Sequence, residues 1–231
     1  LPQLPEYIAE PDANEKVKVT VSELKAKQHD EDMEKDAFMQ PEIKKAYEAE
    51  SLTEEIYIPS FIKGETEKLA GNERGTAYHR VMECLDYHKC DTLEDISENI
   101  NRMLEENKMI KEQAEAVNAE DIYAFVSSDI GARVKKAVLN NMAYREQPFM
   151  FMPDKQLVQG VIDLYFKEDN SFVIVDYKTD KVPKNENGVE ELKQRYSIQL
   201  DYYAKALEQI TGIPVKEKII YSFTIGRAIT L

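Results

Sequence analysis

The stretch Gly160–Asp180, GVIDLYFKEDNSFVIVDYKTD, decides the fold of this chain. Two runs rich in β-branched and aromatic residues flank a short polar segment, Glu168–Ser171. Residues of these types favour strands. Asp169 and Asn170 at the centre tolerate the positive φ of a tight two-residue turn. The pattern therefore predicts a β-hairpin.

The turn also fixes the register of the hairpin. If Asp169 and Asn170 form the loop, Asp163 lies directly opposite Asp176, and their Cβ atoms are about 5 Å apart on one face. Lys178 follows two residues after Asp176 and shares that face. Two carboxylates so close repel each other unless a cation binds both. The opposite face is predicted to be buried and carries Ile162, Leu164, Phe166, Val173, Val175 and Tyr177.

A second interpretation is that Asp163 and Asp176 are ordinary exposed hairpin residues and that Lys178 only offsets their charge. The setting argues against it. Both acids interrupt strongly apolar strands, where a charge is costly unless it is paired or bound to a metal.

Outward from the hairpin, hydrophobic periodicity predicts an alternation of helices and strands. Helical spacing marks residues 74–87 (with His79 on the flank), 92–107 (capped by Asp91 or Thr92), 119–127, 129–139 and 189–210. Alternation marks strands at residues 143–152, 156–166, 172–177 and 215–223. A polar loop is expected at residues 183–188, and Gly212 and Pro214 end the last helix. This order predicts a mixed sheet with helices on both faces.

Residues 1–73 are expected to be an extension of the domain formed by residues 74–231. Val17–Val21 alternates like a short strand, and Ser22 could cap a turn after it. Lys25–Glu50 is dominated by charged residues and is expected to be a solvated linker. Because the chain begins without Met, we expect it to be part of a longer protein.

Composition narrows the class of protein. The net charge is −14, with 30 basic and 44 acidic residues, which argues against a protein that holds nucleic acid by its own field. Bound metal or an attached partner would remove that objection. No apolar run could span a bilayer, so no membrane partner is expected. Cys84 and Cys90 are expected to be free thiols of a cytoplasmic protein, and His29 and His88 to be surface residues.

Four motifs together resemble the RecB family of PD-(D/E)XK nucleases. They are Gly160–Asp163, Val175–Asp180, the Gln199–Tyr203 pair that matches Q-x-x-x-Y, and the Arg74–His79 run that matches G-x-x-x-H. They occur in the order of the family, between about Arg74 and Phe223. The resemblance implies a restriction-endonuclease-like α/β fold and metal-dependent hydrolysis of DNA.

Further segments resemble the C-terminal region of AddA-type helicase–nucleases, which process double-strand breaks in bacteria. They are Lys18–Lys25, the run around Arg74–His79, and Tyr221–Phe223. The resemblance implies helicase domains in the same chain, a second, AddB-like protein in the complex, and a single DNA strand delivered by the motor. No nucleotide-binding G-x-x-x-x-G-K-[ST] loop is present, so ATP hydrolysis would belong to the remainder of such a protein.

The family resemblance assigns a role to each site residue. Asp163, Asp176, His79 and the Tyr177 carbonyl would bind Mg²⁺, with Mn²⁺ as an alternative that imidazole favours. Lys178 would position or deprotonate the attacking water and stabilise developing charge. Cleavage would leave a 5′-phosphate and a 3′-hydroxyl. Two cysteines cannot hold the four-cysteine iron–sulfur cluster of some relatives.

The remaining candidates lie on helices. Gln199 and Tyr203 share a helix face and would orient Lys178 or contact the DNA backbone, although Tyr203 would equally suit a packed core. Glu83 lies one turn after His79 and could reach the site through a water. Two other classes of function stay open: a catalytically silent docking module with the same fold, and a different metal-dependent hydrolase.

Overall fold

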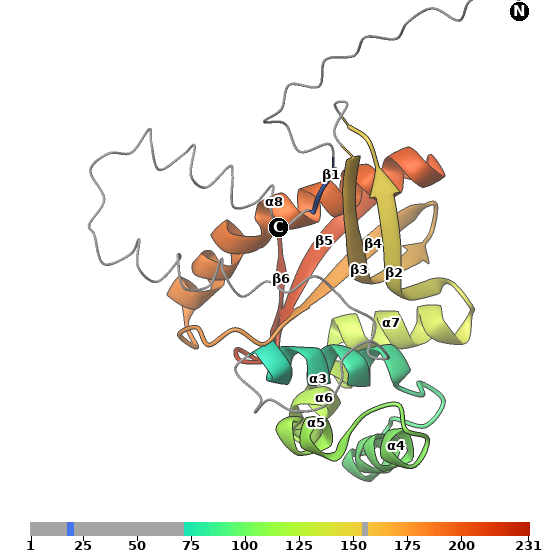
Figure 1. Cartoon of the computed structure of the whole chain (residues 1–231), viewed down its shortest axis with the longest axis vertical. Helices are drawn as coiled ribbons and strands as arrows, with labels where there is room; N and C mark the ends of the chain where they lie inside the picture. The colour runs from blue at the N-terminus through green and yellow to red at the C-terminus, as the bar shows by residue number, and fades with distance from the viewer. Residues whose placement is uncertain (1–17, 21–71, 154–156) are drawn as a thin grey trace, which may run out of the picture.

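A computed structural model describes residues 18–20, 72–153 and 157–231 of the chain (Figure 1). The expected linker at Lys25–Glu50, the cap at Ser22 and the expected surface residue His29 lie outside these ranges. Lys18–Thr20 forms strand β1, so part of the expected 1–73 extension belongs to the sheet of the domain.

The described strands form one mixed sheet. They are β1 (Lys18–Thr20), β2 (Ala143–Phe151), β3 (Leu157–Glu168), β4 (Ser171–Lys178), β5 (Val215–Ser222) and β6 (Arg227–Thr230). Strand β3 is antiparallel to β2 and β4, whereas β4 and β5 run parallel. A strand has two edges, so β1 and β4 share one edge of β3 and pair with its opposite ends. The predicted mixed sheet is confirmed.

Helices cover both faces of this sheet, as predicted (Figure 1). They are α3 (Asn72–Cys84), α4 (Leu93–Glu105), α5 (Lys111–Ala116), α6 (Ala119–Val126), α7 (Asp129–Leu139) and α8 (Glu186–Thr211). The first five gather on one face and bury a large core around Tyr78, Phe125 and Tyr177. Helix α8 covers the other face through Leu192, Leu200 and other residues.

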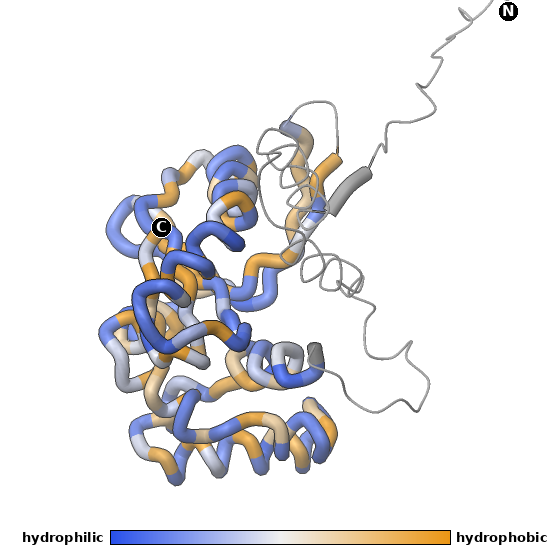
Figure 2. Tube along the Cα trace, turned by 90° about the vertical axis from the view of Figure 1, so that its left-hand side faces the viewer, coloured by the Kyte–Doolittle hydropathy of each residue, from blue (hydrophilic) through white to orange (hydrophobic). Residues whose placement is uncertain are grey.

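Hydrophobic residues predominate along the strands between these layers, and hydrophilic residues line the outer turns of the helices (Figure 2). Burial of this apolar surface is the main force that holds the layers together. In the part of the chain that the structure describes, no helix is both long and apolar enough to cross a membrane.

The predicted register of the β3–β4 hairpin is confirmed. Leu164 pairs with Val175 and Glu168 with Ser171, and Asp169 in the turn has a φ of 56°. The ladder ends at Leu164–Val175, one position before the two acidic residues. Beyond that point β3 and β4 form no further pairs, and both acidic residues lie buried just past the end of the ladder.

The predicted buried face needs one correction. Leu164 and Phe166 pack against α3, α6 and α7, whereas Ile162 packs in the cluster beneath α8. The alternation of β3 is therefore interrupted at Asp163. The same position is irregular on β2, where Glu146 has a φ of 46° between two regular pairs, Arg145–Leu164 and Gln147–Ile162. Such a break in a ladder redirects the side chains around it.

The helix ends follow local chemistry. Thr92 caps α4 in a capping box with Asp95, which settles the choice left open between Asp91 and Thr92. Gly212 ends α8 with a φ of 70°, as predicted. Helix α8 begins at Glu186, inside the segment predicted to be loop, because the Asn185 side chain accepts from the N–H groups of the first turn.

Candidate active site

Asp163 lies just past the end of the β3–β4 ladder, and its position is held by the backbone of the neighbouring strand. Its Oδ2 accepts a hydrogen bond of 2.7 Å from the Tyr177 N–H. Only 8% of the residue is exposed. Burial raises the pKa of this carboxyl group, while His79 and Lys178 act in the opposite direction. A carboxylate in such a place needs a cation close by.

His79 on α3 approaches this carboxylate from the opposite layer. Its Nδ1 lies 3.5 Å from Asp163 Oδ1 and 3.5 Å from Glu146 Oε1, and its Nε2 lies 3.0 Å from the Tyr177 carbonyl oxygen. Burial lowers the pKa of His79, but Asp163 and Glu146 outweigh it and raise the value to about 9. When Nε2–H donates to Tyr177, the other ring nitrogen faces the two carboxylates, as a metal-binding histidine requires.

Glu146 is the site residue that sequence reasoning missed. Ligand atoms of His79, Glu146 and Asp163 all lie within 4.8 Å of one another, a spacing at which they could hold one metal ion. Glu146 belongs to β2, and its positive φ places it beside Asp163. The logic that singled out Asp163 between Ile162 and Leu164 could not find Glu146, because its neighbours Arg145 and Gln147 are also polar.

Asp176 and Lys178 form a buried ion pair next to this group. Lys178 Nζ lies 2.9 Å from Asp176 Oδ2, and the side chains are 14% and 0% exposed. Burial and the nearby Asp163 raise the pKa of Asp176 to about 6, although Lys178 opposes the shift. Burial lowers the pKa of Lys178, but Asp176, Tyr196 and Asp163 outweigh it, so the pKa stays well above its usual range. Lys178 is therefore a cation at neutral pH.

The second oxygen of Asp176 has no hydrogen-bond partner within the part of the chain that the structure describes. Asp176 Oδ1 is buried and accepts no hydrogen bond from any described residue. An unsatisfied buried carboxylate oxygen is costly unless something else binds it. Asp176, which was predicted as a metal ligand, is not one of the three grouped residues, but this oxygen could serve as a further ligand to a cation.

Helix α8 contributes the predicted Gln199 and Tyr203. Gln199 Nε2 donates to the Tyr203 hydroxyl at 2.7 Å, and the Tyr203 ring packs edge-on against Phe149. Tyr203 is 5% exposed, so it is also a core residue. Burial raises its pKa, and Asp176 and Asp163 add to that shift, so its hydroxyl is neutral and available as a donor or acceptor.

Other residues considered from the sequence are not brought to the site. Glu83 pairs with Arg80 at 2.5 Å and is not part of the group of possible direct metal ligands. Its contact with the site through a water stays a prediction. Cys84 and Cys90 are free thiols, as predicted. His88 is exposed, as predicted.

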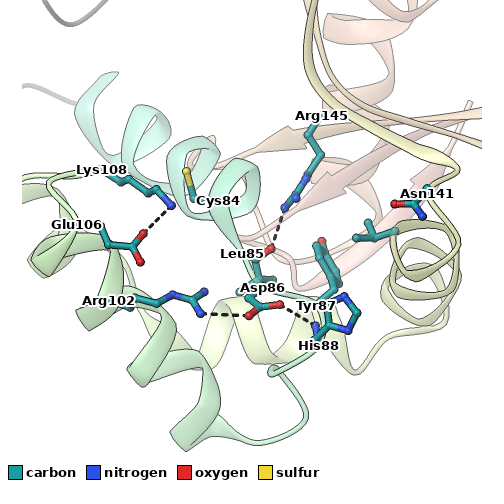
Figure 3. A pocket seen from close by; sticks show the side chains of 11 residues that line it. Cys84, Leu85, Asp86, Tyr87, His88, Arg102, Glu106, Lys108, Asn141 and Arg145 are labelled. Atoms are coloured by element: carbon teal, nitrogen blue, oxygen red, sulfur yellow. Dashed lines mark hydrogen bonds and ion pairs between the residues drawn. The ribbon is translucent and has the colours of Figure 1, made fainter.

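A cavity of about 460 Å³ lies beyond the end of α3 (Figure 3). Three of its basic side chains have protein partners: Arg102 contacts Asp86, Lys108 contacts Glu106, and Arg145 donates to the Leu85 carbonyl. None of the predicted site residues lines it. These three basic side chains are therefore engaged in structural contacts.

Comparison with known proteins agrees with this geometry. Residues 44–227 match the family model of the PD-(D/E)XK nuclease superfamily, and the chain belongs to that superfamily. The restriction-endonuclease-like fold expected from the four motifs is therefore confirmed.

More particularly, the chain is similar to bacterial proteins of the AddA type, which are named as components of an ATP-dependent helicase/nuclease. The protein from Clostridium botulinum (strain 657 / Type Ba4) is 37% identical over 193 residues, which is 77% of this chain and 14% of the relative. The protein from Clostridium novyi (strain NT) is 35% identical over 195 residues, 75% of this chain and 15% of the relative. The chain thus spans about one seventh of these relatives. The resemblance to AddA-type proteins is confirmed.

Proposed function

We propose that this chain is a metal-dependent deoxyribonuclease domain that hydrolyses phosphodiester bonds of single-stranded DNA in an exonuclease-type reaction. The observation that carries the proposal is the convergence of His79, Glu146 and Asp163 beside the buried Asp176–Lys178 pair. Three of these residues are carboxylates, and two of them lie just past the end of the β3–β4 ladder.

The residues present fit a divalent cation. Carboxylate oxygens are preferred by Mg²⁺, and one imidazole nitrogen makes Mn²⁺ a ready substitute. Asp163, Glu146 and His79 would hold the ion, with the unsatisfied oxygen of Asp176 as a further candidate ligand. The Tyr177 carbonyl, predicted as a ligand, lies 3.0 Å from His79 Nε2 and would fix the orientation of the ring. A bound cation would lower the pKa of an attacking water and neutralise the charge of the scissile phosphate.

Side chains and backbone groups of the protein would stabilise the developing charge and position the reacting groups. The Lys178 ammonium supplies a fixed positive charge for the phosphate oxygens, and its raised pKa favours this role over that of a base. The N–H and carbonyl of Tyr177 hold Asp163 and His79 in place from one peptide unit to the next. Gln199 and Tyr203 form a hydrogen-bonded pair on α8 that would contact the DNA backbone or help to orient Lys178.

Delivery of the strand would depend on other parts of a larger assembly. With a net charge of −14, this chain is a poor DNA-binding surface by itself. The named relatives are much longer and carry the name helicase/nuclease. We propose that helicase domains precede this domain, that it works together with an AddB-like protein, and that the assembly acts in the cytoplasm in repair of double-strand breaks by recombination.

The test is cleavage of end-labelled single-stranded DNA by the chain with Mg²⁺ or Mn²⁺, beside an EDTA control. Asp176→Asn and Glu146→Gln are the site variants, and Glu105→Gln at an exposed position of α4 is the matched control. We expect metal-dependent cleavage that both site variants reduce at least 100-fold and the control leaves unchanged.

Calorimetric titration with Mn²⁺ distinguishes a nuclease domain from a catalytically silent docking module. Metal binding that Glu146→Gln weakens, without cleavage, would mean a sound site that lacks its delivery partner, and cleavage would then be sought in the complete helicase–nuclease. A chain that neither binds metal nor cleaves DNA in that assembly would refute the proposal and favour a silent docking module.

A further inference from the structure

We propose that Tyr196 is a positioning residue for Lys178: its ring face holds the ammonium in line with the metal-binding group. The inference rests on the proposed nuclease function. Neither the motifs nor the comparisons single out this residue.

The contact itself is close and enclosed. Lys178 Nζ lies 4.2 Å from the centre of the Tyr196 ring. The Lys178 side chain is 14% exposed and Tyr196 is 9% exposed. A cation over an aromatic face gains more when water is excluded, because solvent no longer screens the attraction to the ring. This pair therefore meets the conditions under which a cation–π contact is strong.

Lys178 needs such a contact because its side chain is a flexible four-carbon stem. An unrestrained ammonium would sample several rotamers, and a misplaced catalytic group loses much of its effect. Asp176 holds the ammonium on one side through a single 2.9 Å contact, which leaves its direction loosely fixed. The Tyr196 ring supplies a second contact, from a different element. With one N–H directed at Asp176 and one at the ring, the ammonium has a third N–H that can meet a phosphate oxygen.

Tyr196 is in turn anchored to the chain segment that carries Lys178. Its hydroxyl donates to Asp180 Oδ1 at 2.7 Å, and Asp180 follows Lys178 by two residues. Arg195 donates to the same oxygen at 2.8 Å and to Glu191 at 2.7 Å. Asp180 thus ties α8 to the end of β4. The hydrogen bond between Tyr196 and Asp180 therefore helps to fix the ring relative to the Lys178 ammonium.

The predicted partners on α8 are placed differently. Gln199 donates to Tyr203, and Tyr203 packs against Phe149. Tyr196 lies about one turn before Gln199 on the helix, and Lys178 contacts its ring. Orientation of Lys178 was expected of the Gln199–Tyr203 pair from the sequence. We assign this role mainly to Tyr196.

The first experiment compares the kinetics of Tyr196→Phe and Tyr196→Leu on single-stranded DNA with Mn²⁺. Phe keeps the ring face and loses only the hydroxyl, so we expect a kcat within about threefold of the parent. Leu removes the ring, and we expect kcat to fall roughly 5- to 30-fold with KM within about twofold. The matched control is Tyr202→Leu on the same helix, where Lys205 lies 5.6 Å from the ring; we expect no change in kcat.

A second series guards against loss of packing in the Leu variant. Phenylalanines with one, two and three ring fluorines at position 196 keep the shape while drawing electron density from the ring face. We expect kcat to fall step by step along this series. In NMR spectra of a chain labelled with ¹³C at lysine Cε, the ring current of Tyr196 should shift the Lys178 side-chain signal upfield. We expect this upfield shift to be lost in Tyr196→Leu and kept in Tyr196→Phe.

The outcomes separate the two proposals. A flat fluorine series, or equal losses of kcat in the Phe and Leu variants, would overturn the positioning role even if the enzyme is active. A Lys178 signal that is the same in the parent and in folded Tyr196→Leu would overturn the contact. If the parent chain and the complete helicase–nuclease both fail to cleave DNA, the proposed function fails, and the Lys178 signal alone decides whether the ring holds the ammonium.

Discussion

Metal binding by this chain should release one proton near neutral pH, because His79 must lose its proton to become a ligand. Its Nδ1 lies 3.5 Å from both Asp163 and Glu146, and these carboxylates outweigh burial and raise its pKa to about 9. Without metal, the imidazolium therefore neutralises part of the acidic site. A cation and this proton compete for the same place.

The size of the effect follows from the shift. At pH 7, a group with a pKa of about 9 is almost fully protonated, so binding should release about one proton per ion. A histidine of ordinary pKa would release only about a quarter of a proton at the same pH. The apparent association constant should also rise about tenfold per pH unit between about pH 7 and 9, since each ion displaces one proton in that range.

Calorimetric titration with Mn²⁺ at pH 7, in buffers of different ionisation enthalpy, measures this proton number. His79→Asn is the control: it should bind the ion more weakly and release no proton from this position. Glu146→Gln should lower both the affinity and the pKa of His79, so its proton release should decline at a lower pH than in the parent. Tight Mn²⁺ binding by the parent with a quarter of a proton or less would refute the assignment of His79 as a ligand.

Three further predictions concern stability and the site. Arg133 and Lys216 lower the pKa of Glu168 to about 2. The stability that its carboxylate contributes is therefore fully present above the pKa of the unfolded chain, about 4.5, and is lost as the pH falls toward 2. Acid unfolding followed by circular dichroism should be less steep between about pH 4.5 and 2 in Glu168→Gln. A Cβ at Gly131 would lie 1.9 Å from the Phe125 carbonyl oxygen, so Gly131→Ala should lower the free energy of unfolding by about 2 kcal/mol or more, and an unchanged urea midpoint would contradict the packing of α6 on α7. Tyr203→Phe removes the hydrogen bond from Gln199, and we expect a loss of cleavage rate of about tenfold or less with the melting temperature nearly unchanged, which parallel kinetic and thermal measurements would check.

Much of the site could be predicted because it depends on a local turn. Asp169 and Asn170 specify a two-residue loop, and the register that follows is confirmed as far as Leu164–Val175, one position before Asp163 and Asp176. Lys178 then shares their face because side chains alternate along a strand. The ion pair between Lys178 and Asp176 confirms this reasoning.

Glu146 could not be placed in the same way. Its role requires that β2 pairs with β3 in one register and that the ladder is interrupted at Asp163. No short-range pattern fixes the register of a strand joined by a longer loop, and Glu146 itself departs from regular strand geometry. For the same reason Ile162, assigned to one face by alternation, packs on the other.

The sequence by itself determined the elements and the hairpin, because turns, caps and hydrophobic periodicity act over a few residues. It also determined which acidic residues were out of place in apolar strands. Only the tertiary structure decided that His79 and Glu146 meet Asp163, and that Tyr196 is the residue of α8 that faces Lys178. These contacts join α3, β2, β3, β4 and α8. Their geometry depends on how two helical layers pack across one twisted sheet, which is a property of the whole core.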